Sequence, residues 1–243
     1  MIELPFLIAL ALTLFAGIYD LKTTDVFEEV PALMISFGLF YWYIVSLIFV
    51  DFLYLINSIL VGIFFLSFGL ILFKLRLWGD GDAWILGGIG FLVPSLNHPL
   101  YPLLFLFSLL LVGAIYTLIY VLIYGLLNKK IKKKFISRVK KHQSILLGFL
   151  IPFLLFSFYL PFLLIIGFLP ILYIYLKTVE YEMKKKIRVS ELKEGDVIVG
   201  KEIVGITKKE IEILKKKKKY VEIQEGVRFT IVFPITLIIL YIL

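Results

Sequence analysis

Long apolar runs separated by short polar segments make up most of this sequence. Five of these runs contain no Asp, Glu, Lys or Arg, and they cover residues 30–50, 52–73, 83–128, 143–176 and 229–243. A helix needs about 20 apolar residues to cross the hydrocarbon core of a bilayer. The pattern therefore predicts an all-α polytopic membrane protein, in which helices cross the bilayer repeatedly.

The first apolar run, at about residues 4–19, is expected to be a span as well. A cleaved signal peptide would begin with a basic region and end in a small-residue cleavage site, and this run has neither. Spans two and three are expected at residues 30–50 and 52–73, joined by a tight turn at Asp51.

Two later runs are too long for a single crossing. As single helices, residues 83–128 would measure about 69 Å and residues 143–176 about 51 Å, against a hydrocarbon core of about 30 Å. Turn residues interrupt both runs, at Pro94-Ser95-Leu96-Asn97-His98-Pro99 and at Tyr159-Leu160-Pro161. We predict eight helical segments, with six full crossings plus a re-entrant hairpin at residues 143–176 as the alternative.

The basic residues indicate the orientation. In this arrangement all 26 Lys and Arg fall on one side of the membrane, at Lys22, Lys74, Arg76, residues 129–141 and residues 177–228. Since Lys and Arg accumulate in cytoplasmic loops, this side is predicted to be cytoplasmic. The same parity places Asp20, which ends the first span, and Asp82, which opens the fourth, at this face. That the two also lie side by side is a hypothesis.

The chain is expected to have three parts. Residues 1–182 would form a transmembrane helical domain carrying both aspartates, residues 183–228 a small cytoplasmic α+β domain, and residues 229–243 a C-terminal transmembrane helix. In the insert, a strand is predicted at residues 197–199 after the Gly195-Asp196 turn, and a second at residues 220–223.

A helix is predicted between these two strands. The capping box Thr207-Lys208-Lys209-Glu210 would open it, and it would run to about Lys219. The lysines at 215–219 are expected to form a solvated surface or to face anionic lipid headgroups, because charge runs usually need no further role.

Composition removes several kinds of chemistry. The 243 residues are 61% hydrophobic, with a mean hydropathy of +1.00, and include no cysteine. Disulfides, a cysteine nucleophile and Cys-ligated zinc are therefore excluded. The two histidines, His98 and His142, stand apart, and neither HExxH nor GxSxG occurs. We expect no metal and no cofactor, and the net charge of +8 is explained by cytoplasmic loops without nucleic-acid binding.

The remaining candidates for chemistry are carboxylates beside the membrane. Gly79-Asp80-Gly81-Asp82 lies between two apolar runs, and Asp20 ends another. Acids so close to hydrocarbon are costly and usually functional. Two carboxylates that share one proton can hydrolyse a peptide, since one activates water while the other polarises the carbonyl. Gly79 and Gly81 would let a substrate backbone approach closely.

The same acids have plainer explanations. Asp80 or Asp82 could cap the following helix, and Asp20 could be an interfacial acid. Asp80 also competes with Asp82 for the role of second catalytic acid, by adjacency alone. Four further acids are expected to be solvated or on the opposite face, namely Asp25, Glu28, Glu29 and Asp51.

With these motifs the chain resembles the archaeal preflagellin and type IV prepilin-like peptidases, which are membrane aspartic proteases of the GxGD kind. Gly79-Asp80-Gly81-Asp82 is similar to their signature and implies Asp82 as one catalytic acid. Asp20-Leu21-Lys22-Thr23-Thr24-Asp25-Val26 resembles their segment after the first span and implies Asp20 as the other. Two C-terminal stretches are similar as well, Gly205-Ile206-Thr207-Lys208-Lys209-Glu210-Ile211 and Gly226-Val227-Arg228-Phe229.

The chain departs from this family at two positions. Phe27 stands where a proline is common, and Trp84 stands where a lysine is frequent. Bacterial relatives that also methylate their product carry a cysteine cluster, so the resemblance implies peptidase activity alone. Pro31-Ala32-Leu33 spells the PAL string of presenilins, but it precedes the GxGD segment instead of following it, and we interpret it as chance.

The resemblance implies a specific substrate. This would be a prepilin or preflagellin precursor with a short basic leader and an apolar helix, cut at the cytoplasmic face, with membrane lipid as the other partner. The alternative is an ion-coupled transporter that uses Asp20 and Asp82 to bind a cation or proton. A scaffold for a secretion or filament assembly is a third possibility.

Overall fold

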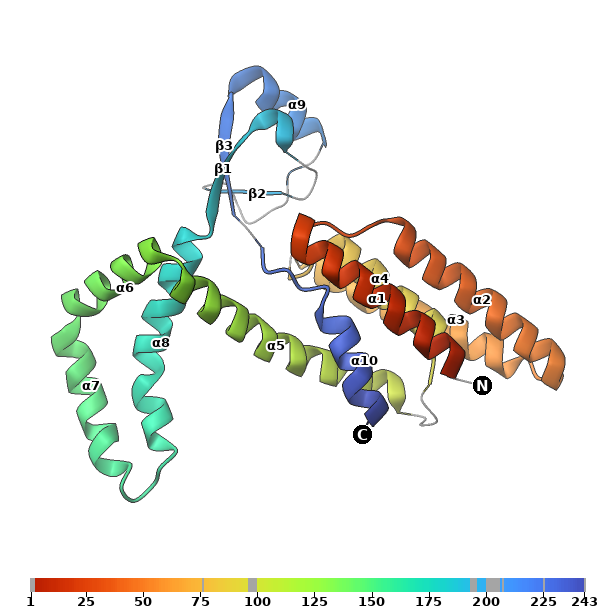
Figure 1. Cartoon of the computed structure of the whole chain (residues 1–243), viewed down its shortest axis with the longest axis horizontal. Coiled ribbons are helices and arrows are strands. Elements are labelled where there is room, and N and C mark those ends of the chain that lie inside the picture. Colours follow the sequence, from red (N-terminus) through yellow and green to blue (C-terminus); the bar gives the residue numbers. More distant parts are fainter. Residues whose placement is uncertain are drawn as a thin grey trace. The chain divides into compact units, whose positions relative to one another are not determined.

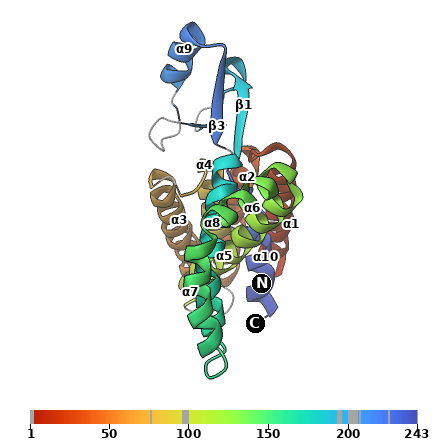
Figure 2. The same cartoon turned by 90° about the vertical axis from the view of Figure 1, so that its left-hand side faces the viewer.

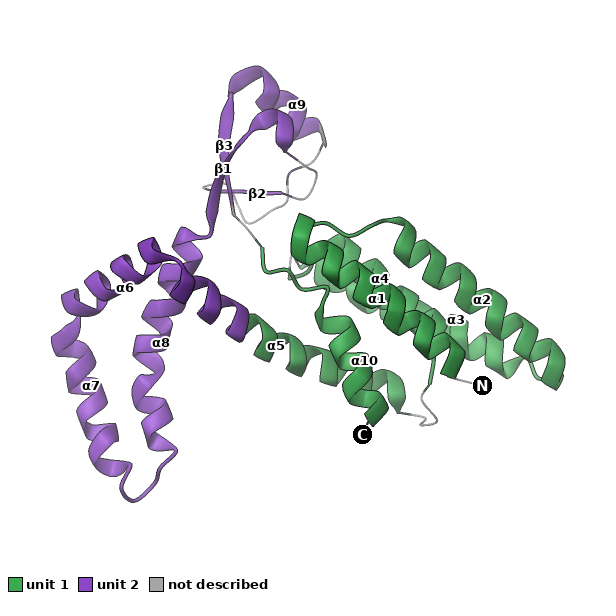
Figure 3. Ribbon diagram, in the orientation of Figure 1, with its two compact units in different colours: residues 1–117, 203–205, 226–243 green, residues 118–202, 206–225 purple. Residues whose placement is uncertain are grey.

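The structure is a computed structural model that describes residues 3–75, 77–95, 100–192, 196–199, 206, 208–224 and 226–242. The chain forms two compact units, coloured separately in Figure 3. Unit 1 comprises residues 1–117, 203–205 and 226–243, and unit 2 comprises residues 118–202 and 206–225.

Unit 1 is built from helices (Figure 1). These are α1 (Glu3–Thr23), α2 (Glu29–Phe49), α3 (Leu53–Lys74), α4 (Asp80–Leu92), the first part of α5 (Tyr101–Leu127) and α10 (Val232–Ile242). Helix α4 packs against α2 and α3, while α1 packs against α10. Ile85, Leu86 and Ile89 of α4 are fully buried, so this short helix is the centre of the unit.

Close backbone contact holds α4 against α3. A Cβ added at Gly90 would lie 2.8 Å from the carbonyl oxygen of Val61, a separation that leaves no room for a side chain. A Cβ at Gly69 would likewise lie 2.8 Å from the Cα of Ala83, at the other end of the contact. Small residues at such contacts let membrane helices approach closely and gain van der Waals packing. This contact fixes α4, and with it Asp82, against α3.

Unit 2 contains a helical part and a small sheet. Its elements are the rest of α5, α6 (Lys129–Lys141), α7 (Gln143–Phe156), α8 (Leu163–Glu182), β1 (Lys184–Arg188), a 3₁₀ turn (Val189–Glu191), β2 (Val197–Ile198), α9 (Lys208–Lys217) and β3 (Tyr220–Gln224). Figures 1 and 2 show α7 beside α8 and β1 beside β3. The sheet is antiparallel in the order β1-β3-β2, and Val189, Ile206 and Val221 are buried in the core under it.

Helix α6 is capped at its start and paired with α8 along its first half. The Asn128 side chain accepts a hydrogen bond from the backbone N–H of Lys130 at 3.0 Å and caps its start. Glu182 of α8 pairs with Lys130 at 2.9 Å and also with Lys134. The next helix, α7, is bent by 79° from α6. A basic helix in this place was not predicted from the Lys-rich pattern.

The prediction of an all-α membrane protein is confirmed at the level of its long helices. Five helices are long and apolar enough to cross a membrane, namely α1, α2, α3, α5 and α8, and α6 with α7 would make a sixth if this bent pair were one span. The protein is a multi-pass membrane protein. The exact number of crossings stays a prediction, because α4, α7 and α10 have 13, 14 and 11 residues.

The turns between spans lie where the sequence indicated. Helices α2 and α3 meet at Asp51, whose Oδ1 accepts a hydrogen bond from the N–H of Leu53 at 2.9 Å. The chain reverses between α7 and α8 around residues 157–162. The predicted turn at residues 94–99 falls between α4 and α5, and its residues 96–99 lie outside the described residues.

The insert agrees with the prediction in part. Strand β2 is one residue shorter than expected, but the N–H of Val199 still donates to Glu222 O at 2.9 Å. Helix α9 ends at Lys217, two residues earlier than expected, and β3 extends through Gln224. Gly195, Thr207 and Arg76 lie outside the described residues. The domain boundaries predicted at residues 182 and 228 are the points where the chain is expected to leave and re-enter the membrane, and they stay a prediction.

Candidate active site

Asp20 lies in the last turn of α1. The helix continues to Thr23, past the expected end of the first span, because polar residues can extend a helix beyond its apolar run. Thr24 ends it with a φ of 60°, a left-handed conformation that is unfavourable for a β-branched residue. The Thr24 N–H donates to Asp20 O at 2.8 Å, which closes the helix. The carboxyl group of Asp20 is turned inward, and the residue is only 7% exposed.

Asp82 lies in the first turn of α4. Gly79 is the N-cap residue, which makes Asp82 the third residue of the helix proper. In this position its carboxylate reaches back to the Gly79 backbone, as the acid of a capping box does. Asp82 is only 8% exposed. A cap alone does not require burial, so the plain capping explanation accounts for one contact of this carboxylate and not for its surroundings.

Thr230 brings the two acids together. Its backbone N–H donates a hydrogen bond to Asp20 Oδ2 at 3.2 Å, and its hydroxyl donates to Asp82 Oδ1 at 2.8 Å. Only three bonds separate these two donors in threonine, so the accepting carboxylate oxygens lie within about 10 Å of each other. All three residues belong to unit 1, and Thr230 is 1% exposed. One residue thus links the ends of two helices that are far apart in the sequence.

The segment that carries Thr230 is itself fixed. The Arg228 guanidinium donates a hydrogen bond to the carbonyl oxygen of Leu21 in the last turn of α1. The Tyr116 hydroxyl donates to Arg228 O at 2.8 Å. The ring of Phe229 lies 5.1 Å from that of Trp78, which immediately precedes the GDGD motif. These contacts hold residues 228–230 against α1, α5 and the start of α4.

The two motif glycines have different surroundings. A Cβ added at Gly81 would lie 2.6 Å from the Cβ of Val26, in the loop that follows α1. Gly81 is therefore required for packing within the chain, so a close approach of substrate is not needed to explain it. A Cβ at Gly79 would meet only Asp82 Oδ2, at 3.6 Å, which is an ordinary contact.

Asp80 does not join the pair. It is exposed, and its Oδ1 accepts a hydrogen bond from the N–H of the adjacent Gly81 at 2.9 Å. Asp51 is engaged at the start of α3. Among the described residues, no group of three or more His, Cys, Asp or Glu side chains is placed to hold a metal ion.

No role at the site was predicted for Thr230, Arg228 or Tyr116, although Arg228 lies in a stretch that resembles the peptidases. One signal was available for two of them, because Arg228 and Thr230 are polar residues at the start of the last apolar run. Tyr116 stands within a long apolar helix and carries no such signal.

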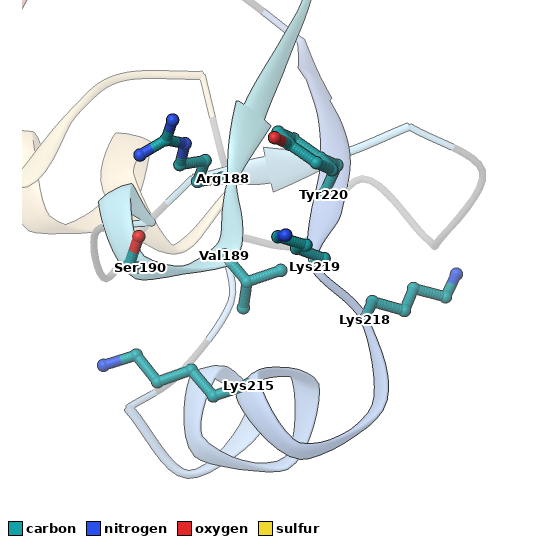
Figure 4. Close-up of a pocket in the computed structure, with 7 residues that line it drawn as sticks. All are labelled: Arg188, Val189, Ser190, Lys215, Lys218, Lys219 and Tyr220. Carbon is teal, nitrogen blue, oxygen red and sulfur yellow. The ribbon is translucent and has the colours of Figure 1, made fainter.

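A basic hollow in unit 2 is a second candidate, with a volume of about 410 Å³. It is lined by Arg188, Val189, Ser190, Lys215, Lys218, Lys219 and Tyr220. Figure 4 shows that the cationic ends point in different directions and do not converge on one centre. This surface suits attraction to anionic headgroups but presents no arrangement for chemistry. The expectation for residues 215–219 stays a prediction.

The helices and the site together define the class: a multi-pass membrane protein with two buried carboxylates hydrogen-bonded to one threonine. The chain is 39% identical over 88 residues to the preflagellin peptidase of Methanocaldococcus jannaschii, a match that covers 36% of this chain and 37% of that protein. The aligned part is thus little more than a third of the curated relative. No family model matches the chain, and no solved structure matches it.

Proposed function

We propose that this protein is a membrane-embedded aspartic endopeptidase. It removes the short basic leader from prepilin-like or preflagellin precursors at the cytoplasmic face of the membrane. The observation that carries the proposal is the pair of hydrogen bonds that the buried residue Thr230 donates, one to Asp20 and one to Asp82. The similarity to a preflagellin peptidase supports the substrate class.

The chemistry requires one ionised and one protonated carboxyl. The ionised carboxylate takes a proton from water as the water oxygen attacks the scissile carbonyl carbon, and the protonated acid donates its proton to the carbonyl oxygen. Collapse of the tetrahedral intermediate then breaks the C–N bond, and a proton passes to the leaving amine. Two neighbouring carboxyl groups do not both ionise easily, because their negative charges repel each other. A pair such as Asp20 and Asp82 therefore favours the state in which one group is ionised and the other is protonated.

The position of the acids suits a substrate that is itself anchored in the bilayer. Asp20 lies at the end of a long apolar helix, and Asp82 lies at the start of a buried one. A precursor whose apolar helix lies in the membrane would present its junction with the basic leader at such a boundary. The charge distribution predicts that Lys22, two residues after Asp20, lies on the cytoplasmic side.

The test is leader removal by the purified full-length protein in liposomes, with a preflagellin-type precursor as substrate and product mass as the readout. Asp20→Asn and Asp82→Asn should each reduce the rate by at least about 10²-fold, since each removes one acid-base group. Asp51→Asn is the matched control, because an asparagine can keep the hydrogen bond to the Leu53 N–H. If wild-type protein leaves the precursor intact but drives ion-dependent uptake, the transporter alternative holds instead.

A further inference from the structure

We infer that Thr230 is a positioning residue that sets the mutual geometry of the two acids. This inference rests on the proposed function and extends it to a residue outside the GxGD signature. Thr230 stands just before α10, and its partners stand on α1 and α4. It uses two separate donors, so each acid has its own hydrogen bond to the same residue.

The hydroxyl is the informative donor. At 2.8 Å its hydrogen bond to Asp82 is shorter than the 3.2 Å bond from the N–H to Asp20. Thr230 therefore directs its N–H to Asp20 and its hydroxyl to Asp82. A donor held at one carboxylate oxygen leaves the other oxygen of that group for water or substrate. It also limits rotation of the carboxyl group, so that productive alignment is prepared before substrate binds.

The surroundings make this contact specific to Thr230. A buried threonine inside a helix often donates its hydroxyl to the backbone carbonyl four residues earlier. Thr236, four residues into the same terminal helix, does this with Val232 O at 2.9 Å. Thr13 does the same with Ala9 O at 2.7 Å. The hydroxyl of Thr230 instead bonds a side chain 148 positions away, which is why a purely local role does not explain it.

Packing on both sides fixes the backbone of Thr230. Arg228, bound to Leu21 O, and Phe229, against Trp78, fix the backbone on the N-terminal side of Thr230. Val232 and Phe233, which are fully buried, fix it on the other side. With the backbone held in this way, the N–H faces α1 and the side chain faces α4. Both directions are needed for the pair of hydrogen bonds.

The experiment compares variants at two buried threonines. Thr230→Val keeps the shape and the backbone N–H but removes the hydroxyl, and Thr230→Ser keeps the hydroxyl. Thr236→Val is the matched control, since it removes a buried hydroxyl that donates to Val232 O and not to either acid. Each variant is assayed in liposomes for kcat and KM of leader removal.

The expected result is a loss in kcat. Thr230→Val should lower kcat by at least about 10-fold with KM within about twofold, because a prearranged donor is lost without loss of substrate contact. Thr230→Ser should recover most of the rate, and Thr236→Val should behave like wild type. Equal kcat for Thr230→Val and wild type would overturn the inference, as would equal loss in Thr230→Val and Thr230→Ser.

The variants distinguish failure of the proposed function from failure of the inference about Thr230. If Thr230→Val does not insert or melts early, Thr230→Ala and Thr230→Ser carry the same comparison, since they differ only in the hydroxyl. If Asp20→Asn and Asp82→Asn retain cleavage, the proposed function fails and the role of Thr230 fails with it. If both aspartate variants are inactive while Thr230→Val and Thr230→Ala cleave at the wild-type rate, only the inference about Thr230 is wrong.

Discussion

The indole nitrogen of Trp42 donates a hydrogen bond to the carbonyl oxygen of Leu92 at 3.0 Å, and both residues are buried. Leu92 is the last residue of α4, and the hydroxyl of Ser58 donates to the preceding carbonyl, that of Phe91, at 2.7 Å. The last carbonyls of a helix have no partner within it, and an unpaired one is costly away from water. Side chains from α2 and α3 therefore fix where α4 ends. Because α4 is a rigid helix, this also fixes the position of Asp82 in its first turn.

Replacing Trp42 with phenylalanine should destabilise the protein. The variant keeps an aromatic ring but leaves the Leu92 carbonyl without its donor, which costs about 1–3 kcal/mol in a buried site. The apparent melting temperature of the purified protein in detergent measures the loss. Trp84→Phe is the control, because Trp84 is 43% exposed and no described hydrogen bond involves its indole. An equal change in both variants would mean that the Trp42 hydrogen bond contributes nothing specific.

Alanine should impair the protein at Gly81 but be tolerated at Gly79. Gly81→Ala places a methyl group 2.6 Å from the Val26 Cβ, so the loop after α1 must move and the site with it. Gly79→Ala meets only an ordinary contact, so its activity should stay within about threefold of wild type, as the backbone conformation there suits alanine. Leader-cleavage rates of the two variants make the comparison.

A second substitution, at Val26, tests whether the contact with Val26 causes the loss in Gly81→Ala. Val26→Gly removes the side chain that a methyl group at position 81 would meet, so the double variant Gly81→Ala with Val26→Gly should regain part of the lost rate. Contacting residues couple in this way, whereas independent ones add. A double variant slower than Gly81→Ala alone would argue that Gly81 acts on the substrate and not on Val26.

Asp80→Asn should retain the cleavage rate of wild type within about twofold. Asp80 is exposed and bonds only its neighbour Gly81 among the described hydrogen bonds, and an asparagine oxygen can replace that acceptor. The measurement is the same liposome assay that is used for Asp82→Asn. Loss of activity in Asp80→Asn with retention in Asp82→Asn would reassign the second acid.

The long helices could be predicted from the sequence, and both acids could be singled out as candidates, because these signals are local. An uncharged run has few alternatives to a membrane helix, and an acid at its boundary is conspicuous. The parity of the predicted spans also predicts that Asp20 and Asp82 lie at one face. Their meeting could not be derived, since it depends on the packing of α4 between α2 and α3 and on the terminal segment.

Other features lacked a readable signal. Thr230 at the start of an apolar run looks like an ordinary helix cap, and its partner Asp82 is 148 positions away. Strand β1 is almost entirely basic and lacks the alternation of a half-buried strand, because it is an edge strand that pairs with β3 on one side only. The length of α4 depends on Trp42 and Ser58, which are distant in sequence.

The most direct test of joint action is a double-mutant cycle on the two acids. Single-turnover rates of leader removal are measured for wild type, Asp20→Asn, Asp82→Asn and the double variant in the same liposomes. Groups that act as one unit give grossly non-additive losses. The account predicts that each single variant is as slow as the double variant. A double variant that is slower than wild type by the product of the two single-variant losses would contradict it.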